Sequence, residues 1–147
     1  MKPEEINIYR EIQKNTEMAV KAIETLGDKV YDEEFGRQIS RQSLKYADIR
    51  NKAVNRLLEA KAEPVHPNHL SDMMLKGSIH ANTLLNTSTG HLAELMIQGS
   101  NRGITEMYKV LNHSPQLQKN GGSHALELAK ELMDFEEKCI GVLKKYL

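Results

Sequence analysis

The sequence predicts one all-α domain over residues 1–147, folded as a four-helix bundle. Apolar residues recur every three or four positions along most of the chain, which is the period of one face of an α-helix. The chain has no Trp, two Phe and five Tyr, so the aromatic residues that favour strands are scarce. Pro64, Pro67 and Pro115 lie between the periodic segments, where they interrupt helices.

The first two helices are predicted over residues 3–29 and 33–61, joined by a short turn. Asp32 is the expected N-cap of the second helix, and Pro64 and Pro67 end it. The second apolar stripe is more polar than usual in its middle. Its members are Phe35, Ile39, Gln42, Tyr46, Ile49, Ala53 and Leu57.

Two further helices are predicted over residues 68–86 and 90–112. Asn86-Thr-Ser-Thr-Gly90 indicates a break between them, with Ser88 or Thr89 as the next N-cap. One helix through residues 69–112 is the alternative. The apolar face of the earlier helix is Leu70, Met73/Met74, Gly77, Ala81 and Leu84/Leu85; that of the later one is Leu92, Leu95/Met96, Gly99, Gly103, Met107 and Val110/Leu111.

Gly99 and Gly103 lie four residues apart, and each costs about 1 kcal/mol relative to Ala inside a helix. We expect them to allow close approach of a neighbouring helix. Room for a ligand or a water molecule is the alternative.

The last helix is predicted from Ser123, its N-cap, to the end of the chain, after a loop over residues 114–122. Its stripe is the most regular of the five, and comprises Ala125, Leu128, Leu132, Phe135, Cys139, Val142 and Tyr146.

The connections predict how these helices are arranged. Short connections join the first two long helices and the last two, so each pair forms an antiparallel hairpin. About 25 residues separate the hairpins, enough to cross the bundle and leave the middle two long helices parallel. This is the ferritin-like topology.

The chain also resembles the ferritin-like superfamily over nearly its whole length. The similarity lies in the exit from Leu57 to Pro64, the crossover LKGSIHANTLL, the segment LAELMIQGSNRGITEMYKVL and the terminal amphipathic helix. It is similar to a bacterial branch of unknown function that lacks the complete di-iron motif.

That superfamily holds two metals with four Glu and two His, using Glu-x-x-His pairs on two helices. No predicted helix contains Glu-x-x-His; the one match in the sequence, Glu63-x-x-His66, lies in the proline-containing segment after the second helix. The nearest patterns are His91-x-x-Glu94, Asp48-x-x-Asn51 and Glu127-x-x-Lys130, and none supplies the pair. Ferroxidase, oxygenase and iron-storage functions are therefore not supported, and no catalytic, cofactor-binding or metal residue is assigned.

The remaining reactive side chains have ordinary interpretations. We expect His66 and His69 to be solvated, and His80 and His91 to be partly buried and hydrogen-bonded. Cys139 lies on the core stripe and should behave as a small hydrophobe. The methionines at helical spacing should fill the core; they are Met73, Met74, Met96, Met107 and Met133.

Charge and composition bound the partners and the compartment. Twenty basic and twenty acidic residues give a formal net charge of zero, which argues against binding nucleic acid or an anionic membrane. One cysteine, a charged N-terminus and no long apolar run predict a soluble cytoplasmic protein without a signal peptide.

Two functions remain from the sequence. The first is a non-catalytic bundle that acts through binding or self-association. The second is an iron or manganese protein with an unorthodox site formed by Glu17, Asp48, Glu94 and Glu131. A stress- or sporulation-related structural role rests on superfamily analogy.

Self-association is expected to give a dimer through the crossover helix. Its apolar residues are Met73, Met74, Leu75, Ile79, Leu84 and Leu85, and they spread over more than one face.

Overall fold

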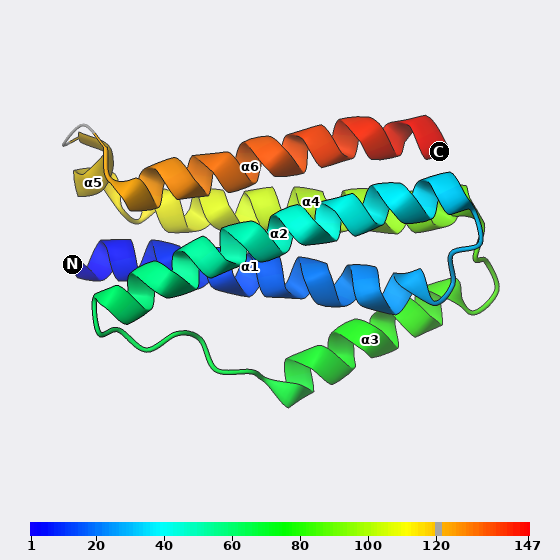
Figure 1. Ribbon diagram of the computed structural model, residues 1–147, viewed down its shortest axis with the longest axis horizontal. Helices are drawn as coiled ribbons and strands as arrows, with labels where there is room; N and C mark the ends of the chain where they lie inside the picture. Colours follow the sequence, from blue (N-terminus) through cyan, green and yellow to red (C-terminus); the bar gives the residue numbers. More distant parts are fainter. Residues whose placement is uncertain (120–121) are drawn as a thin grey trace.

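The computed structural model describes residues 1–119 and 122–147, and the regular secondary structure of these residues is helical without any strand (Figure 1). This confirms the all-α prediction. The elements are α1 Pro3–Gly27, α2 Glu33–Glu59, α3 His69–Thr83, α4 Thr89–Asn112, α5 Pro115–Lys119, α6 His124–Leu143 and the 3-10 turn η1 Lys144–Tyr146. Across the described residues, no helix combines the length and the apolar character needed to cross a bilayer.

Four long helices, α1, α2, α4 and α6, lie side by side (Figure 1). Helices α1 and α6 run in one direction, and α2 and α4 run in the opposite direction. Helix α1 is central to the packing, because it contacts α2, α4, α6 and also α3. The N-terminus and the C-terminus therefore lie at opposite ends of the molecule.

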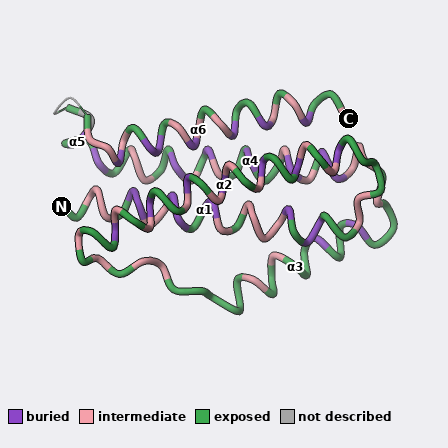
Figure 2. The backbone as a smooth tube through the Cα atoms, viewed as in Figure 1, coloured by how far each residue is buried: buried purple, intermediate pink, exposed green. Residues whose placement is uncertain are grey.

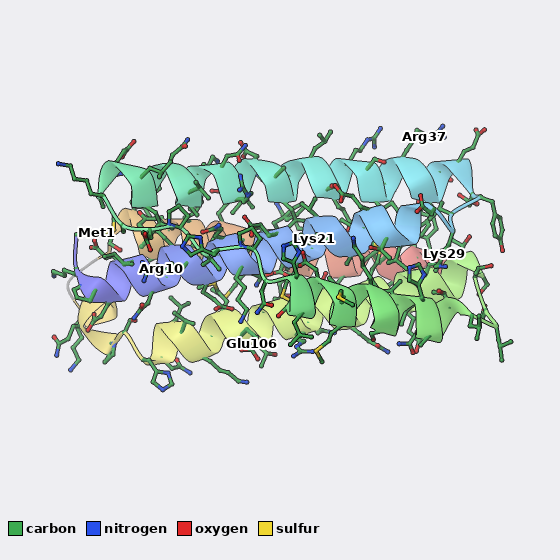
Figure 3. The ribbon with its side chains drawn as sticks, turned by 90° about the horizontal axis from the view of Figure 1, so that it is seen from below. Met1, Arg10, Lys21, Lys29, Arg37 and Glu106 are labelled. Carbon is green, nitrogen blue, oxygen red and sulfur yellow. The ribbon has the colours of Figure 1, made fainter. Side chains whose placement is uncertain are left out.

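The linker of residues 60–68 and helix α3 carry the chain from one end of the long helices to the other. Both run along the outside of α1, on the side where Figure 3 shows Arg10 and Lys21. Arg10 donates to the carbonyl of Glu63 at 3.0 Å, and Lys21 forms an ion pair with Asp72 of α3.

Gln13 of α1 fixes the middle of this linker. Its side-chain nitrogen donates to the carbonyl of Val65 at 3.1 Å, and its side-chain oxygen accepts from the Val65 amide at 2.8 Å. Gln13 is only 2% exposed, so one buried amide satisfies both backbone groups of an extended segment.

The predicted N-caps are confirmed. Asp32 accepts a hydrogen bond from Phe35 N, Ser88 from His91 N, and Ser123 from Leu126 N. The break that precedes α4 is also confirmed, so residues 69–112 form two helices.

The C-terminal part of the chain differs from the prediction in two places. Residues Pro115–Lys119 form the short helix α5 inside the expected loop, since Pro115 suits a first helical turn. Residues 120–121 of that loop lie outside the described residues. Helix α6 ends at Leu143, and the chain continues as a 3-10 turn, a common way for a helix to end.

The core lies between the four long helices, where Figure 2 shows their buried sides facing one another. All seven predicted stripe residues of α2 are buried, as expected. In α6 the stripe is corrected: Glu136 and Leu143 are buried where Phe135 and Val142 were expected, and the latter two are half-buried. A period of 3.6 residues places position 136 four after Leu132 and three before Cys139.

Helix α3 lies outside this core and reverses the prediction for its apolar face. It packs on α1 through Ile79 and Thr83, with Asp72 and Leu75 half-buried beside them. The predicted face is exposed instead, so Met73 and Met74 do not fill the core; its members are Leu70, Met73, Met74, Gly77, Ala81, Leu84 and Leu85. Met96 and Met107 are buried as expected, and Met133 is half-buried.

Candidate functional site

A polar layer crosses the core at the middle of the four long helices. Each helix contributes to it, and its members are Asn15 of α1, Tyr46 of α2, Ser100 and Gly103 of α4, and Glu136 and Cys139 of α6. Asn15 is 8% exposed, and Glu136 is 1% exposed. Buried polar groups at this depth are costly unless they are paired, so their contacts decide what the layer does.

At Gly103, side chains of α1 and α6 lie against the backbone of α4. Asn15 donates through Nδ2 to the Gly103 carbonyl at 3.0 Å. A Cβ atom on Gly103 would lie within 2.9 Å of Asn15 Oδ1 and of both Glu136 carboxyl oxygens. The missing side chain therefore makes room for the carboxyl group of Glu136.

The two glycines that were predicted to allow close helix packing, Gly99 and Gly103, have different surroundings. Gly99 is exposed, and no atom would approach its Cβ within 4 Å. It was wrong to place Gly99 on the packing face, because Ser100 occupies the buried position in that turn. Gly103 does allow close approach, but what approaches it is a buried side chain.

The surroundings of Glu136 favour the protonated, neutral form of its carboxyl group. Burial raises the pKa of its carboxyl from 4.5 to about 8, while hydrogen bonding by Asn15 and Tyr46 opposes that rise. Its Oε1 is shielded from solvent and has no hydrogen-bond partner within the described part of the chain. No ion pair among the described residues includes Glu136.

The other titratable groups in the layer are also held neutral. Burial raises the pKa of the Tyr46 hydroxyl, and the nearby Glu136 adds to that rise. Burial raises the pKa of the Cys139 thiol to about 12. A thiol in this state is a poor nucleophile, which agrees with the expectation that Cys139 acts as a small hydrophobe.

The four carboxylates considered for a metal site are not brought together. Glu17 pairs with Arg50 at 2.9 Å, and Glu94 accepts from Gln98 at 3.5 Å. Lys45 and Lys52 lie between Asp48 and Glu131.

The hydrogen bond from Lys45 is the largest influence that lowers the pKa of Glu131. Across residues 1–119 and 122–147, no group of three or more His, Cys, Asp or Glu side chains is placed to hold a metal ion.

Three of the four histidines discussed in the sequence analysis have the exposure that was predicted. His66 and His69 are exposed, as expected. His91 is half-buried, with Nε2 2.8 Å from the carbonyl of Asn82, which also agrees. His80 is exposed, which is a correction: α3 turns that position away from α1.

The outward face of α3 is the second candidate. We use this term for the residues Leu70, Met73, Met74, Gly77, Ala81, Leu84 and Leu85, the last two of which follow the final turn. Its five large apolar side chains are exposed by 67% to 97%. Leu75 and Ile79 point to the opposite side and pack toward the core, so the crossover is apolar on two faces, as predicted.

Comparisons with known proteins identify no relative. No family model matches the chain, and no curated protein or solved structure matches it. The candidate sites therefore rest on their own geometry.

The sequence interpretation missed Glu136. A charged residue next to an apolar stripe is ordinarily assigned to the exposed side of the helix. Two features of the sequence could have indicated that Glu136 is buried: its helical spacing from Leu132 and Cys139, and the glycine at position 103 on the preceding helix.

Proposed function

We propose that this chain is a non-catalytic ferritin-like four-helix bundle of the cytoplasm that acts by binding a second copy of itself. The directions of the long helices support the ferritin-like arrangement, since α1 and α2 form one hairpin, α4 and α6 form another, and α2 and α4 run parallel. The linker and α3 supply the crossover between them.

The outward face of α3 carries this proposal. Five large apolar side chains gather on one short segment, and Leu85 is 97% exposed. All five side chains are at least two-thirds exposed. Clustered exposed apolar side chains often mark a contact site.

The charge around this face favours a second copy over a charged partner. The charged residues of α3 are Asp72, which pairs with Lys21 of α1, and Lys76. The outward face itself carries none. Two such faces can meet without desolvating charged groups, and a formal net charge of zero adds no long-range repulsion between copies.

Light scattering at micromolar concentration tests the proposal. We expect a mass of twice 16.7 kDa that falls toward 16.7 kDa on dilution. The double variant Leu84→Lys/Leu85→Lys should shift the protein to the monomer, because it places four charges in the interface of each dimer.

The matched control is Leu44→Lys/Leu58→Lys. These α2 side chains are 73% and 58% exposed but lie off the outward face of α3, so this variant should remain dimeric with unchanged helicity. A wild-type protein that stays at 16.7 kDa throughout would exclude self-association.

A further inference from the structure

We infer that two copies pair through antiparallel α3 helices, with the two-fold axis of the dimer passing over Gly77. This inference rests on the proposed function and specifies the geometry of that interface. It follows from the order of large and small residues along the outward face, and from the space above Gly77.

Part of the outward face is symmetric about Gly77, whereas Met74 and Leu85 fall opposite His80 and His69. Leu70 and Leu84 stand seven residues to either side of it, or about 10 Å along the helix. A two-fold axis over Gly77 places each residue opposite the one at equal distance on the other side. It therefore sets Leu70 of one copy against Leu84 of the other.

The same axis sets one large residue against a small one, since Met73 meets Ala81 of the second copy. Met74 meets the exposed ring of His80. In a parallel pair each residue would meet its own equivalent, so Met73 would crowd Met73 and Ala81 would leave a gap against Ala81. Cores and interfaces favour the filled arrangement, because gaps forfeit dispersion contacts.

Gly77 is where two antiparallel helices would come closest. No atom of the chain would lie within 4 Å of a Cβ at this position, so the backbone of α3 is open to an approaching partner. In an antiparallel pair, the partially positive end of each helix dipole lies beside the partially negative end of the other, whereas in a parallel pair like ends lie side by side and repel. The open glycine and the matched side chains thus favour the same arrangement.

Disulfide trapping tests the geometry. We expect Gly77→Cys to form a homodimeric disulfide under mild oxidation, because the two Cα atoms face each other across the axis at bridging distance. Leu70→Cys alone should crosslink about tenfold more slowly, since its symmetry mate lies near Leu84. Mixing Leu70→Cys with Leu84→Cys should restore fast crosslinking as the mixed species.

The native thiol does not interfere, since Cys139 is buried. Fast self-crosslinking of Leu70→Cys would show a parallel pair and overturn the inference. A wild-type dimer in which Gly77→Cys fails to crosslink would overturn the inference but leave self-association standing. A monomeric wild-type protein would overturn both.

A side chain at the axis gives a second measurement. Gly77→Leu should weaken the dimer at least about tenfold, because two leucines would hold the helices apart at their crossing. Gly99→Leu is the matched control, since Gly99 is another exposed helical glycine with no atom within 4 Å of its Cβ position. An equal dimer affinity of Gly77→Leu and wild type would place the axis elsewhere.

Discussion

Replacing Gly103 with alanine should destabilise the fold, although alanine is the better helix former. In an open helical position the change stabilises by about 0.5–1 kcal/mol. Here the new Cβ would lie within 2.9 Å of Asn15 Oδ1 and both carboxyl oxygens of Glu136. Overpacking of this kind costs about 1–3 kcal/mol.

The carboxyl group has little room to give way. Glu136 is 1% exposed and Asn15 is 8% exposed, so a shift of either displaces packed neighbours and strains the bond from Asn15 to the Gly103 carbonyl. We therefore expect the free energy of unfolding of Gly103→Ala to fall by about 1–2 kcal/mol.

Urea denaturation followed by circular dichroism measures this change. Gly99→Ala provides the control on the same helix, because its Cβ meets nothing within 4 Å. That variant should gain about 0.5–1 kcal/mol, so the two alanines should differ by about 1.5–3 kcal/mol. If Gly103→Ala stabilises as much as Gly99→Ala, the close packing of the carboxyl against α4 is refuted.

Three further outcomes are expected. The free energy of unfolding of the wild-type protein should fall by about 3–5 kcal/mol as pH rises from about 4.5 to 8, because the folded state binds the Glu136 proton more tightly than the unfolded state does. In urea titrations at several pH values, Glu136→Gln should lack this pH-dependent part of the stability. Gln13→Ala should lose about 1–3 kcal/mol and speed proteolysis of the linker, because both backbone groups of Val65 lose their partner. Lys61→Gly should raise the melting temperature by a few degrees, because Lys61 has a φ of 57°.

Helix identity and most boundaries could be predicted because they depend on local chemistry. The stripe of α2 was right at every position, since Phe35 to Leu57 faces one continuous core. The caps at Asp32, Ser88 and Ser123 were right because an N-cap depends on nearby atoms of the same turn.

The errors arose where tertiary context decides. The periodicity of α3 correctly marked an amphipathic helix, but the face with more large residues points outward and Ile79 and Thr83 point toward α1. Periodicity shows that a helix has an apolar face, but it does not show which other part of the protein that face packs against. For the same reason nothing local distinguished Gly99 from Gly103, whose difference is the side chain of Glu136 on another helix.

The polar layer explains how four similar apolar stripes pack in one register. Leu, Ile and Met side chains tolerate repacking, so stripes alone hold helices together without fixing their offset. Glu136 is different, because its carboxyl needs the space over Gly103 and the polar groups of Asn15 and Tyr46.

A slip of α6 by one turn along α4, about 5.4 Å, would bring the carboxyl toward Met107 or Gly99. At Met107 it would be buried against an apolar side chain, and at Gly99 it would lie near solvent and leave the core. Only one register therefore gives the buried Glu136 carboxyl both the space and the polar neighbours that offset the cost of its burial. In the same way, a polar residue in the apolar seam of a coiled coil fixes the alignment of the helices.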